Sequence, residues 1–248
     1  VMKIAKIYIY SILSLFAAFG FTSCMEVDNF DGPEAYYTGK IIDRTTGQPV
    51  LASQGECKVR LWEMSYSTNP SPQDIPVKQD GTFKNTKLFN GTYDVEPRGA
   101  WWPVEKHRVP IGRHTEEDII EVTPYLHIID FTMDYDAEAN ELIVSCRLSA
   151  PITEGLPNIR SVRPFLSLNQ FCGSNSCIGE YANFDEYKAD MNSSWARIPK
   201  DEDGNSKPYQ FRLPVKKGYF YFVRMGAYVD DEFHNYNYSE IKTIEIPQ

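Results

Sequence analysis

Two stretches, 37-YTGKIIDRTTGQPV-50 and 80-DGTFKNTKLFNGTYDV-95, decide the fold of this chain. In the first, a strand-forming run leads into Thr46-Gly47-Gln48-Pro49, which has the composition of a turn. In the second, Asp80-Gly81 and Asn90-Gly91 are hairpin signals, each ahead of a short strand. Strands at such short spacing, separated by turn residues, predict an all-β sandwich.

A strand between these stretches supports the same fold. Residues 56–64 alternate along the chain, with Cys57, Val59 and Leu61 on one face and Lys58, Arg60 and Trp62 on the other. We expect strands at 36–43, 75–78, 82–84 and 92–95 as well, and no helix. The first domain is therefore predicted to span residues 34–122.

A second β-sandwich is predicted over residues 123–248, after the stiff junction Thr123-Pro124. Its expected strands are 126–133, 142–148, 159–168, 209–213, 219–229 and 239–246. About 40 residues between Leu168 and Tyr209 lack strand character, and a loop of that length is usually functional or locally ordered. Tyr181, Phe184 and Tyr187, at a spacing of three, indicate a short helix within it.

The first 23 residues have the features of a lipoprotein signal peptide. Lys3 and Lys6 precede an apolar run, Ile7–Phe21, and the small residues Thr22 and Ser23 then lead to Cys24. The run is about 15 residues long, short of the roughly 20 that span a bilayer. We expect Cys24 to carry the lipid and 24–33 to form an acidic tether. The alternative is an uncleaved transmembrane helix.

The net charge of the chain limits the classes of partner that it is expected to bind. The formal net charge is −9, which argues against nucleic acid or anionic lipid headgroups, because both are bound through clustered Lys and Arg. The expected membrane contact is made through the N-terminal lipid. Aromatic residues make up 14 % of the chain, which suits a β-rich extracytoplasmic protein.

The remaining four cysteines form two groups. Cys172 and Cys177 lie in a loop, close enough in sequence to form a disulfide in an oxidising compartment. Cys57 and Cys146 each lie in an alternating strand, where two buried free thiols are favoured over a long-range disulfide. No cysteine has zinc-site spacing with histidine.

The sequence also resembles known families. The two stretches quoted above resemble prealbumin-like or carboxypeptidase-regulatory-like modules, and 218-GYFYFVRMGAYVDD-231 with 236-YNYSEIKTIEI-246 resembles the end of a fibronectin type III or immunoglobulin-like module. Their order behind a lipidation cysteine and 28-DNFDGPEA-35 resembles an uncharacterised two-domain lipoprotein family of Bacteroidetes. That resemblance implies display on the outer membrane and association with starch-utilisation-type glycan uptake. It carries over no catalytic residues.

Two groups of aromatic residues are candidate ligand-binding sites. Trp101 and Trp102 follow a strand, and since adjacent strand residues face opposite ways, one could pack inside while the other stacks on a sugar ring. The alternative is that both pack between the domains. Tyr181, Phe184, Tyr187 and Trp195 mix with amide and carboxylate residues in the long loop, where a small local core is the alternative.

The sequence predicts no catalytic residues, no metal ligands and no cofactor. It contains no nucleophile elbow, phosphate-binding glycine loop or metal-binding histidine motif. We therefore expect a non-catalytic surface lipoprotein that binds or presents oligosaccharide. The alternatives are a spacer that docks onto outer-membrane transporter components and, less favoured, a hydrolase.

Overall fold

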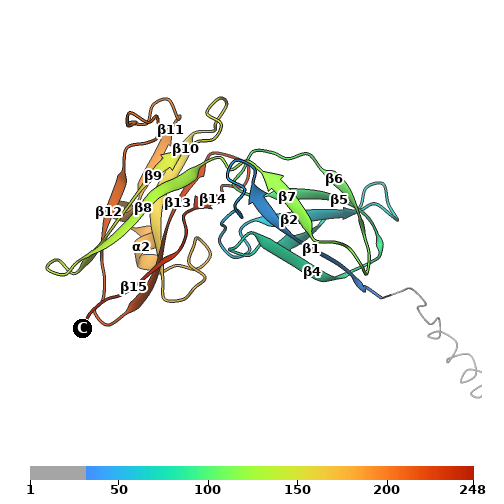
Figure 1. Ribbon diagram of the computed structural model, residues 1–248, viewed down its shortest axis with the longest axis horizontal. Helices are drawn as coiled ribbons and strands as arrows, with labels where there is room; N and C mark the ends of the chain where they lie inside the picture. Colours follow the sequence, from blue (N-terminus) through green and yellow to red (C-terminus); the bar gives the residue numbers. More distant parts are fainter. Residues whose placement is uncertain (1–31) are drawn as a thin grey trace, which may run out of the picture. The chain divides into compact units, whose positions relative to one another are not determined.

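Alternating burial along the strands gives this chain two β-sandwich domains, so the predicted all-β class is confirmed (Figure 1). The computed structural model describes residues 32–248. The predicted signal peptide, the lipidation site Cys24 and nearly all of the predicted tether lie outside the described residues and stay predictions. No helix within the described range is long and apolar enough to cross a bilayer.

The N-terminal domain packs a sheet of order β4-β1-β7 against a sheet of order β3-β2-β5-β6. Strand β1 runs antiparallel to β4 and parallel to β7. The strands of the described domain are β1 (Ala35–Asp43), β2 (Lys58–Glu63), β3 (Gln73–Pro76), β4 (Thr82–Leu88), β5 (Gly91–Arg98), β6 (His107–Ile111) and β7 (Asp118–Val122).

Burial alternates strictly along β1, so one of its faces forms the domain core. Gly39 lies on that buried face, and a Cβ at this position would come within 2.4 Å of the Phe83 ring and of the Asp118 carbonyl oxygen. Glycine is thus required where β4 and β7 approach the middle of β1.

Of the two predicted hairpins, the one at Asp80-Gly81 is present locally, with an isolated antiparallel bridge between Val77 and Phe83. The turn at Asp80-Gly81 exists, with the Lys78 amide donating to the Thr82 carbonyl at 2.8 Å, but β3 pairs with β2 and β4 with β1. The hairpin predicted at Asn90-Gly91 is wrong, because β4 and β5 belong to different sheets. Both turns carry the chain between the layers of the sandwich.

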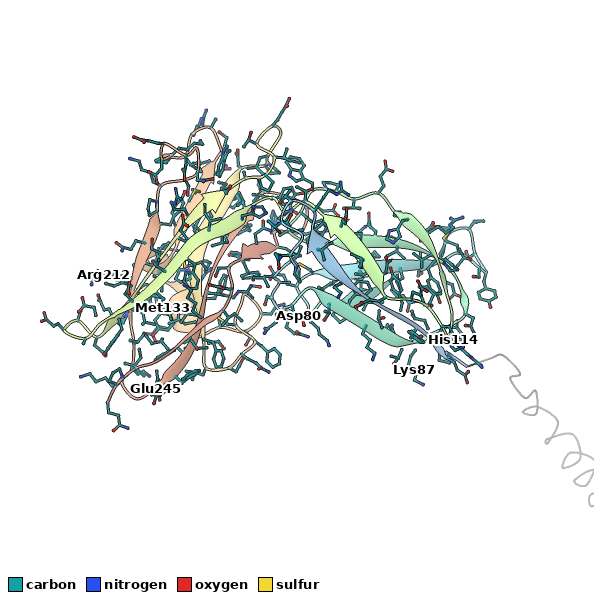
Figure 2. The ribbon with its side chains drawn as sticks, viewed as in Figure 1. Asp80, Lys87, His114, Met133, Arg212 and Glu245 are labelled. Carbon is teal, nitrogen blue, oxygen red and sulfur yellow. The ribbon has the colours of Figure 1, made fainter. Side chains whose placement is uncertain are left out.

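The C-terminal domain packs a sheet of order β12-β9-β8 against a sheet of order β11-β10-β13-β14, in which β15 also pairs with β13. Within the described residues its strands are β8 (His127–Asp136), β9 (Glu141–Ser149), β10 (Ile159–Ser167), β11 (Ala189–Ser193), β12 (Tyr209–Pro214), β13 (Phe220–Val229), β14 (Tyr236–Tyr238) and β15 (Lys242–Glu245). Charged side chains such as Arg212 and Glu245 lie at the periphery (Figure 2).

The long segment after β10 is ordered by short elements. A tight turn at 173–176 is followed by helix α2 (Gly179–Asn183), the 3-10 helix η1 (Asp185–Tyr187) and strand β11. The predicted short helix is therefore present. The sequence did not predict β11, because this strand is short, contains no β-branched or aromatic residue, and has polar outward residues.

Each domain has its own apolar core, and the two are joined by a buried polar network. Arg224, only 1 % exposed, donates to the carbonyl oxygens of Ala52, Cys172 and Ser239 at 2.9–3.2 Å. Since Ala52 belongs to the N-terminal domain and the other residues to the C-terminal domain, this guanidinium forms hydrogen bonds with both domains. Residues 33–248 accordingly form one compact unit.

Glu56 completes this network from the N-terminal side. Its carboxylate accepts hydrogen bonds from the Tyr238 hydroxyl at 2.6 Å, the Ser174 hydroxyl at 3.0 Å and the Tyr236 amide at 2.8 Å. Burial raises the pKa of Glu56, although these hydrogen bonds and the nearby Arg224 act in the opposite direction. Buried, hydrogen-bonded polar groups thus connect the two domains.

The structure agrees with the predicted state of Cys57 and Cys146 and differs from it at Cys172 and Cys177. Cys57 and Cys146 are buried free thiols in separate cores, as predicted, and burial raises the pKa of each to about 12. Cys172 and Cys177 are also free, so the predicted disulfide is absent. The Cys172 thiol instead donates to the carbonyl oxygens of Phe165 and Phe222, at 3.2 and 3.4 Å.

Candidate functional site

The tryptophan pair lies on the segment between β5 and β6, next to the connector that leads to the second domain. The Trp102 amide donates to the Thr123 carbonyl at 2.9 Å, and the Tyr125 amide donates to the Ala100 carbonyl at 3.2 Å. These bonds fix the segment after β5 against the connector between the domains. Adjacent side chains on extended backbone point in opposite directions, so the two indoles diverge.

Trp101 belongs to the core of the N-terminal domain. It is 3 % exposed, and its indole Nε1 donates to the Pro97 carbonyl at 3.3 Å. Gly99 makes room for it, because a Cβ there would lie 2.3 Å from the indole and 2.7 Å from the Cys57 sulfur. Trp101 is therefore almost fully enclosed, although it still lines the cavity described below, and its role in ligand binding stays a prediction.

Trp102 packs against the core of the C-terminal domain and remains half-buried. Its ring centroid lies 5.4 Å from that of Tyr125, in a tilted arrangement. Its indole Nε1 is buried and has no hydrogen-bond partner, which costs about 1–3 kcal/mol for a group of this kind. Each tryptophan thus packs on the core of a different domain, as in the alternative of packing between the domains, and Trp102 keeps the more accessible ring.

Trp102 lines a cavity of about 370 Å³, which we call the Trp102 cavity. This volume lies within the range of roughly 300–1,000 Å³ that is usual for small-molecule sites. Both domains contribute to its wall, which consists of Glu96, Pro97, Arg98, Gly99, Trp101, Trp102, Pro103, Val104, Tyr125, Pro157, Asp231, Glu232 and Phe233.

The wall combines aromatic faces with charged hydrogen-bonding groups. Phe233 is half-buried, and the Arg98 guanidinium lies 5.4 Å from the centre of its ring. Arg98 Nε also donates to Glu96 at 2.7 Å, which fixes the guanidinium in place. The cavity therefore offers flat apolar surfaces beside carboxylate acceptors and guanidinium donors.

The Asp231 carboxylate and the Tyr125 hydroxyl in the wall are only partly solvated. Burial raises the pKa of Asp231, even though the backbone amides of His234 and Phe233 donate to it. Burial and the neighbouring Asp231 raise the pKa of the Tyr125 hydroxyl to about 12, so it stays protonated at neutral pH. The low solvation strengthens any hydrogen bond that a ligand makes here.

The second predicted aromatic group does not form a site. Tyr181, Tyr187 and Trp195 are all less than 10 % exposed and belong to the core of the C-terminal domain, so their predicted role as sugar platforms is wrong. The long segment folds inward, and the Tyr181 hydroxyl donates to the Pro214 carbonyl at 2.6 Å. Phe184 is 53 % exposed, and its role in binding stays a prediction.

Another cavity, of about 300 Å³, lies around the contact between Asp43 and His127. Aliphatic and proline side chains dominate its wall, and the Asp43 carboxylate is already engaged by His127 Nε2 at 2.8 Å and by Thr45 and Thr46. Its polar groups are thus satisfied within the protein, which makes the Trp102 cavity the better candidate.

Sequence reasoning missed Phe233, Arg98 and Asp231. Phe233 lies in the turn between β13 and β14, and no motif marks it. Arg98 is one of several charged residues at alternate positions of β5, which is the ordinary pattern of a solvated sheet face. The outward alternation of Glu96 and Arg98 just before the tryptophan pair was the available signal.

Comparison with known proteins places this two-domain β-sandwich architecture in a group of related proteins. The family model described as "Protein of unknown function (DUF3823) N-terminal domain" matches residues 35–123. The model described as "Domain of unknown function (DUF3823_C)" matches residues 126–243. The chain belongs to the DUF3823 family. Among curated proteins, none matches the chain.

Solved structures share this fold. A DUF3823 family protein from Bacteroides uniformis has 22 % identity and a TM-score of 0.71, and one from Parabacteroides merdae has 22 % identity and a TM-score of 0.63. A third protein, from Bacteroides uniformis and named a "putative carbohydrate binding protein", has 19 % identity and a TM-score of 0.68. In each case 87 % of this chain and 100 % of the other is covered. The predicted resemblance to a two-domain family of unknown function is confirmed.

Proposed function

We propose that this protein binds an oligosaccharide in the Trp102 cavity without catalysing a reaction on it. The observation that carries the proposal is the wall of that cavity, where Trp102, Tyr125 and Phe233 lie beside Arg98 and the acidic residues Glu96, Asp231 and Glu232. Sugar rings present apolar C–H faces and many hydroxyls. They therefore match a site of flat aromatic surfaces with carboxylate acceptors at its edge.

The setting of this binding is part of the proposal. The protein is a lipid-anchored accessory of a glycan uptake system, held through Cys24 at the outer face of the outer membrane. The signal-peptide pattern and the acidic tether in the sequence support the anchor. The relative from Bacteroides uniformis named for carbohydrate binding supports the ligand class.

Glycan binding by the soluble fragment 25–248 tests the proposal. Calorimetric titration with plant and host oligosaccharides is expected to give saturable binding to at least one. Phe233→Ala is expected to weaken that binding about tenfold, since loss of one aromatic contact corresponds to about 1.4 kcal/mol.

The matched control is Phe89→Ala, which removes an aromatic residue that is 46 % exposed and does not line the cavity. It is expected to leave the affinity unchanged. Flat isotherms across the whole panel, or equal losses in both variants, would contradict the proposal. Incubation with the bound glycan is expected to release no new reducing ends, and their release would contradict the non-catalytic role.

A second candidate function is that of a rigid spacer that docks onto outer-membrane transporter components. The buried network of Arg224 and Glu56, which joins the domains, favours it. Co-purification with such components, together with an absence of glycan binding, would favour the spacer.

A further inference from the structure

The four-stranded sheet of the N-terminal domain carries a second aromatic surface beside the Trp102 cavity. On β2, Val59 and Leu61 face the core, whereas Trp62 faces outward and is half-buried. The Arg98 guanidinium lies 5.9 Å from the centre of the Trp62 ring and 5.4 Å from that of Phe233. One side chain thus connects the cavity to the outer face of the sheet.

This outer face is basic on an acidic protein. Strand pairing aligns the outward residues of β3, β2, β5 and β6 on one side of the sheet. The basic residues there are Lys58, Arg60, Arg98, Lys106 and Arg108, and the acidic ones are Asp74, Asp94 and Glu96. Basic groups therefore outnumber acidic groups on this face, whereas the whole chain has a net charge of −9.

The three carboxylates of the face are already paired. Arg60 binds Asp74 through two hydrogen bonds of 2.6 and 2.8 Å, Arg108 binds Asp94 at 2.7 and 3.0 Å, and Arg98 binds Glu96. Lys106 forms no ion pair with any residue of the described chain. Its Nζ lies 3.5 Å from the centre of the Trp62 ring.

Lys106 thus lies over an aromatic face and near Asp94 without an ion pair, and such a cation is available to an anionic ligand. An exposed cation–π contact is weaker than a charge-assisted hydrogen bond to a carboxylate. If a carboxylate draws Lys106 away, the indole is uncovered and a sugar ring can stack on it.

We propose that this outer sheet face binds a uronic acid residue of the oligosaccharide whose adjoining ring occupies the Trp102 cavity. Lys106 binds the carboxylate, and Trp62 stacks on the ring that carries it. The inference rests on the proposed function, which supplies the occupant of the cavity. A membrane surface fits less well, because acidic residues are interspersed among the basic ones on this face.

Titration of fragment 25–248 with uronate oligosaccharides and with their methyl esters tests the proposal, because esterification removes the charge and keeps the sugar. Oligogalacturonate and oligomannuronate serve as probes. For at least one, the acid is expected to bind about tenfold more tightly than its ester, as one charge-assisted hydrogen bond allows. Added salt is expected to reduce the difference.

Lys106→Gln is expected to abolish the preference for the acid, and Trp62→Ala to weaken binding of acid and ester alike. Lys84→Glu is the control, since this exposed lysine lies on β4 in the other sheet. Equal affinity for acid and ester, or a preference that survives Lys106→Gln, would overturn the proposal. So would binding to anionic lipid vesicles that Lys106→Gln abolishes.

The two proposals fail in distinguishable ways. If neutral oligosaccharides bind and Phe233→Ala weakens them, but no acid is preferred, only the uronate proposal is lost. If no glycan of either kind binds, the proposed function itself is lost.

Discussion

Single residues at the domain junction have roles that follow from their immediate contacts. Trp101 and Trp102 are neighbours in sequence, yet one fills the core of the first domain and the other packs on the second. Gly99 matters because of Trp101, whose indole occupies the space that a side chain at residue 99 would need.

Gly99→Ala is expected to lower the free energy of unfolding by about 1–3 kcal/mol, the usual cost of an overpacked core. Urea denaturation of fragment 25–248 measures it. Gly179→Ala is the control, because a Cβ there would lie 3.7 Å from its nearest contact. Similar unfolding midpoints for Gly99→Ala and the unaltered protein would contradict the expectation.

At this scale the sequence revealed part of the candidate site. Trp102 could be singled out because it is one of two adjacent tryptophans after a strand. Phe233 could not, because it contacts Arg98 of the other domain, and no short-range sequence pattern indicates that these two side chains are close. The predicted platforms Tyr181, Tyr187 and Trp195 failed for a related reason, since exposure depends on how a loop folds.

Among the elements, the turn after β1 links local structure to the contact between the domains. The Asp43 carboxylate accepts hydrogen bonds from the Thr45 amide and hydroxyl and from the Thr46 hydroxyl, at 2.7–2.9 Å. It also contacts His127 of β8, at 2.8 Å. Burial alone would raise the pKa of Asp43, but these hydrogen bonds and His127 outweigh it, and the pKa lies below its usual value.

Asp43→Ala is expected to cost about 1–3 kcal/mol of stability, because it leaves the partners of a largely buried carboxylate unsatisfied. Asp80→Ala removes a similar turn, in which an exposed carboxylate accepts from the Thr82 amide and hydroxyl, and is expected to cost less. Thermal unfolding of both variants compares them. A larger loss for Asp80→Ala would contradict this interpretation.

The turn residues of this sequence predict where most loops lie, but they do not predict which strands pair. Asp80-Gly81 and Asn90-Gly91 both mark turns, yet each leads from one layer of the sandwich to the other. Local turn chemistry sets the direction of the backbone, whereas the choice of sheet depends on contacts distant in sequence. For the same reason β1 pairs in parallel with β7, about 80 residues further along, which no short-range signal predicts.

For the whole molecule, Arg224 is a buried side chain that bonds the two domains to each other. It is almost fully buried and bonds carbonyl groups of both domains. Its guanidinium also lies 4.0 Å from the centre of the Tyr238 ring.

Arg224→Met is expected to destabilise the protein by about 3–5 kcal/mol, because buried carbonyl groups and Glu56 lose their cationic partner. Calorimetry should show one unfolding transition for the unaltered protein and two for the variant, as the domains uncouple. Arg212→Met, which removes an exposed arginine paired with Asp136 and Glu141, should retain one transition. A single transition in Arg224→Met would contradict this role.

The position of β1 also determines how the protein carries mechanical load. If the chain is tethered through residues ahead of Ala35, tension from the membrane enters at the start of β1, while the far end of that strand holds the second domain through Asp43 and His127. The pull then runs along β1, whose hydrogen bonds to β4 and β7 are loaded together in shear rather than opened one after another. Such a strand resists extraction, so a ligand dragged away from the cell should leave the first domain folded.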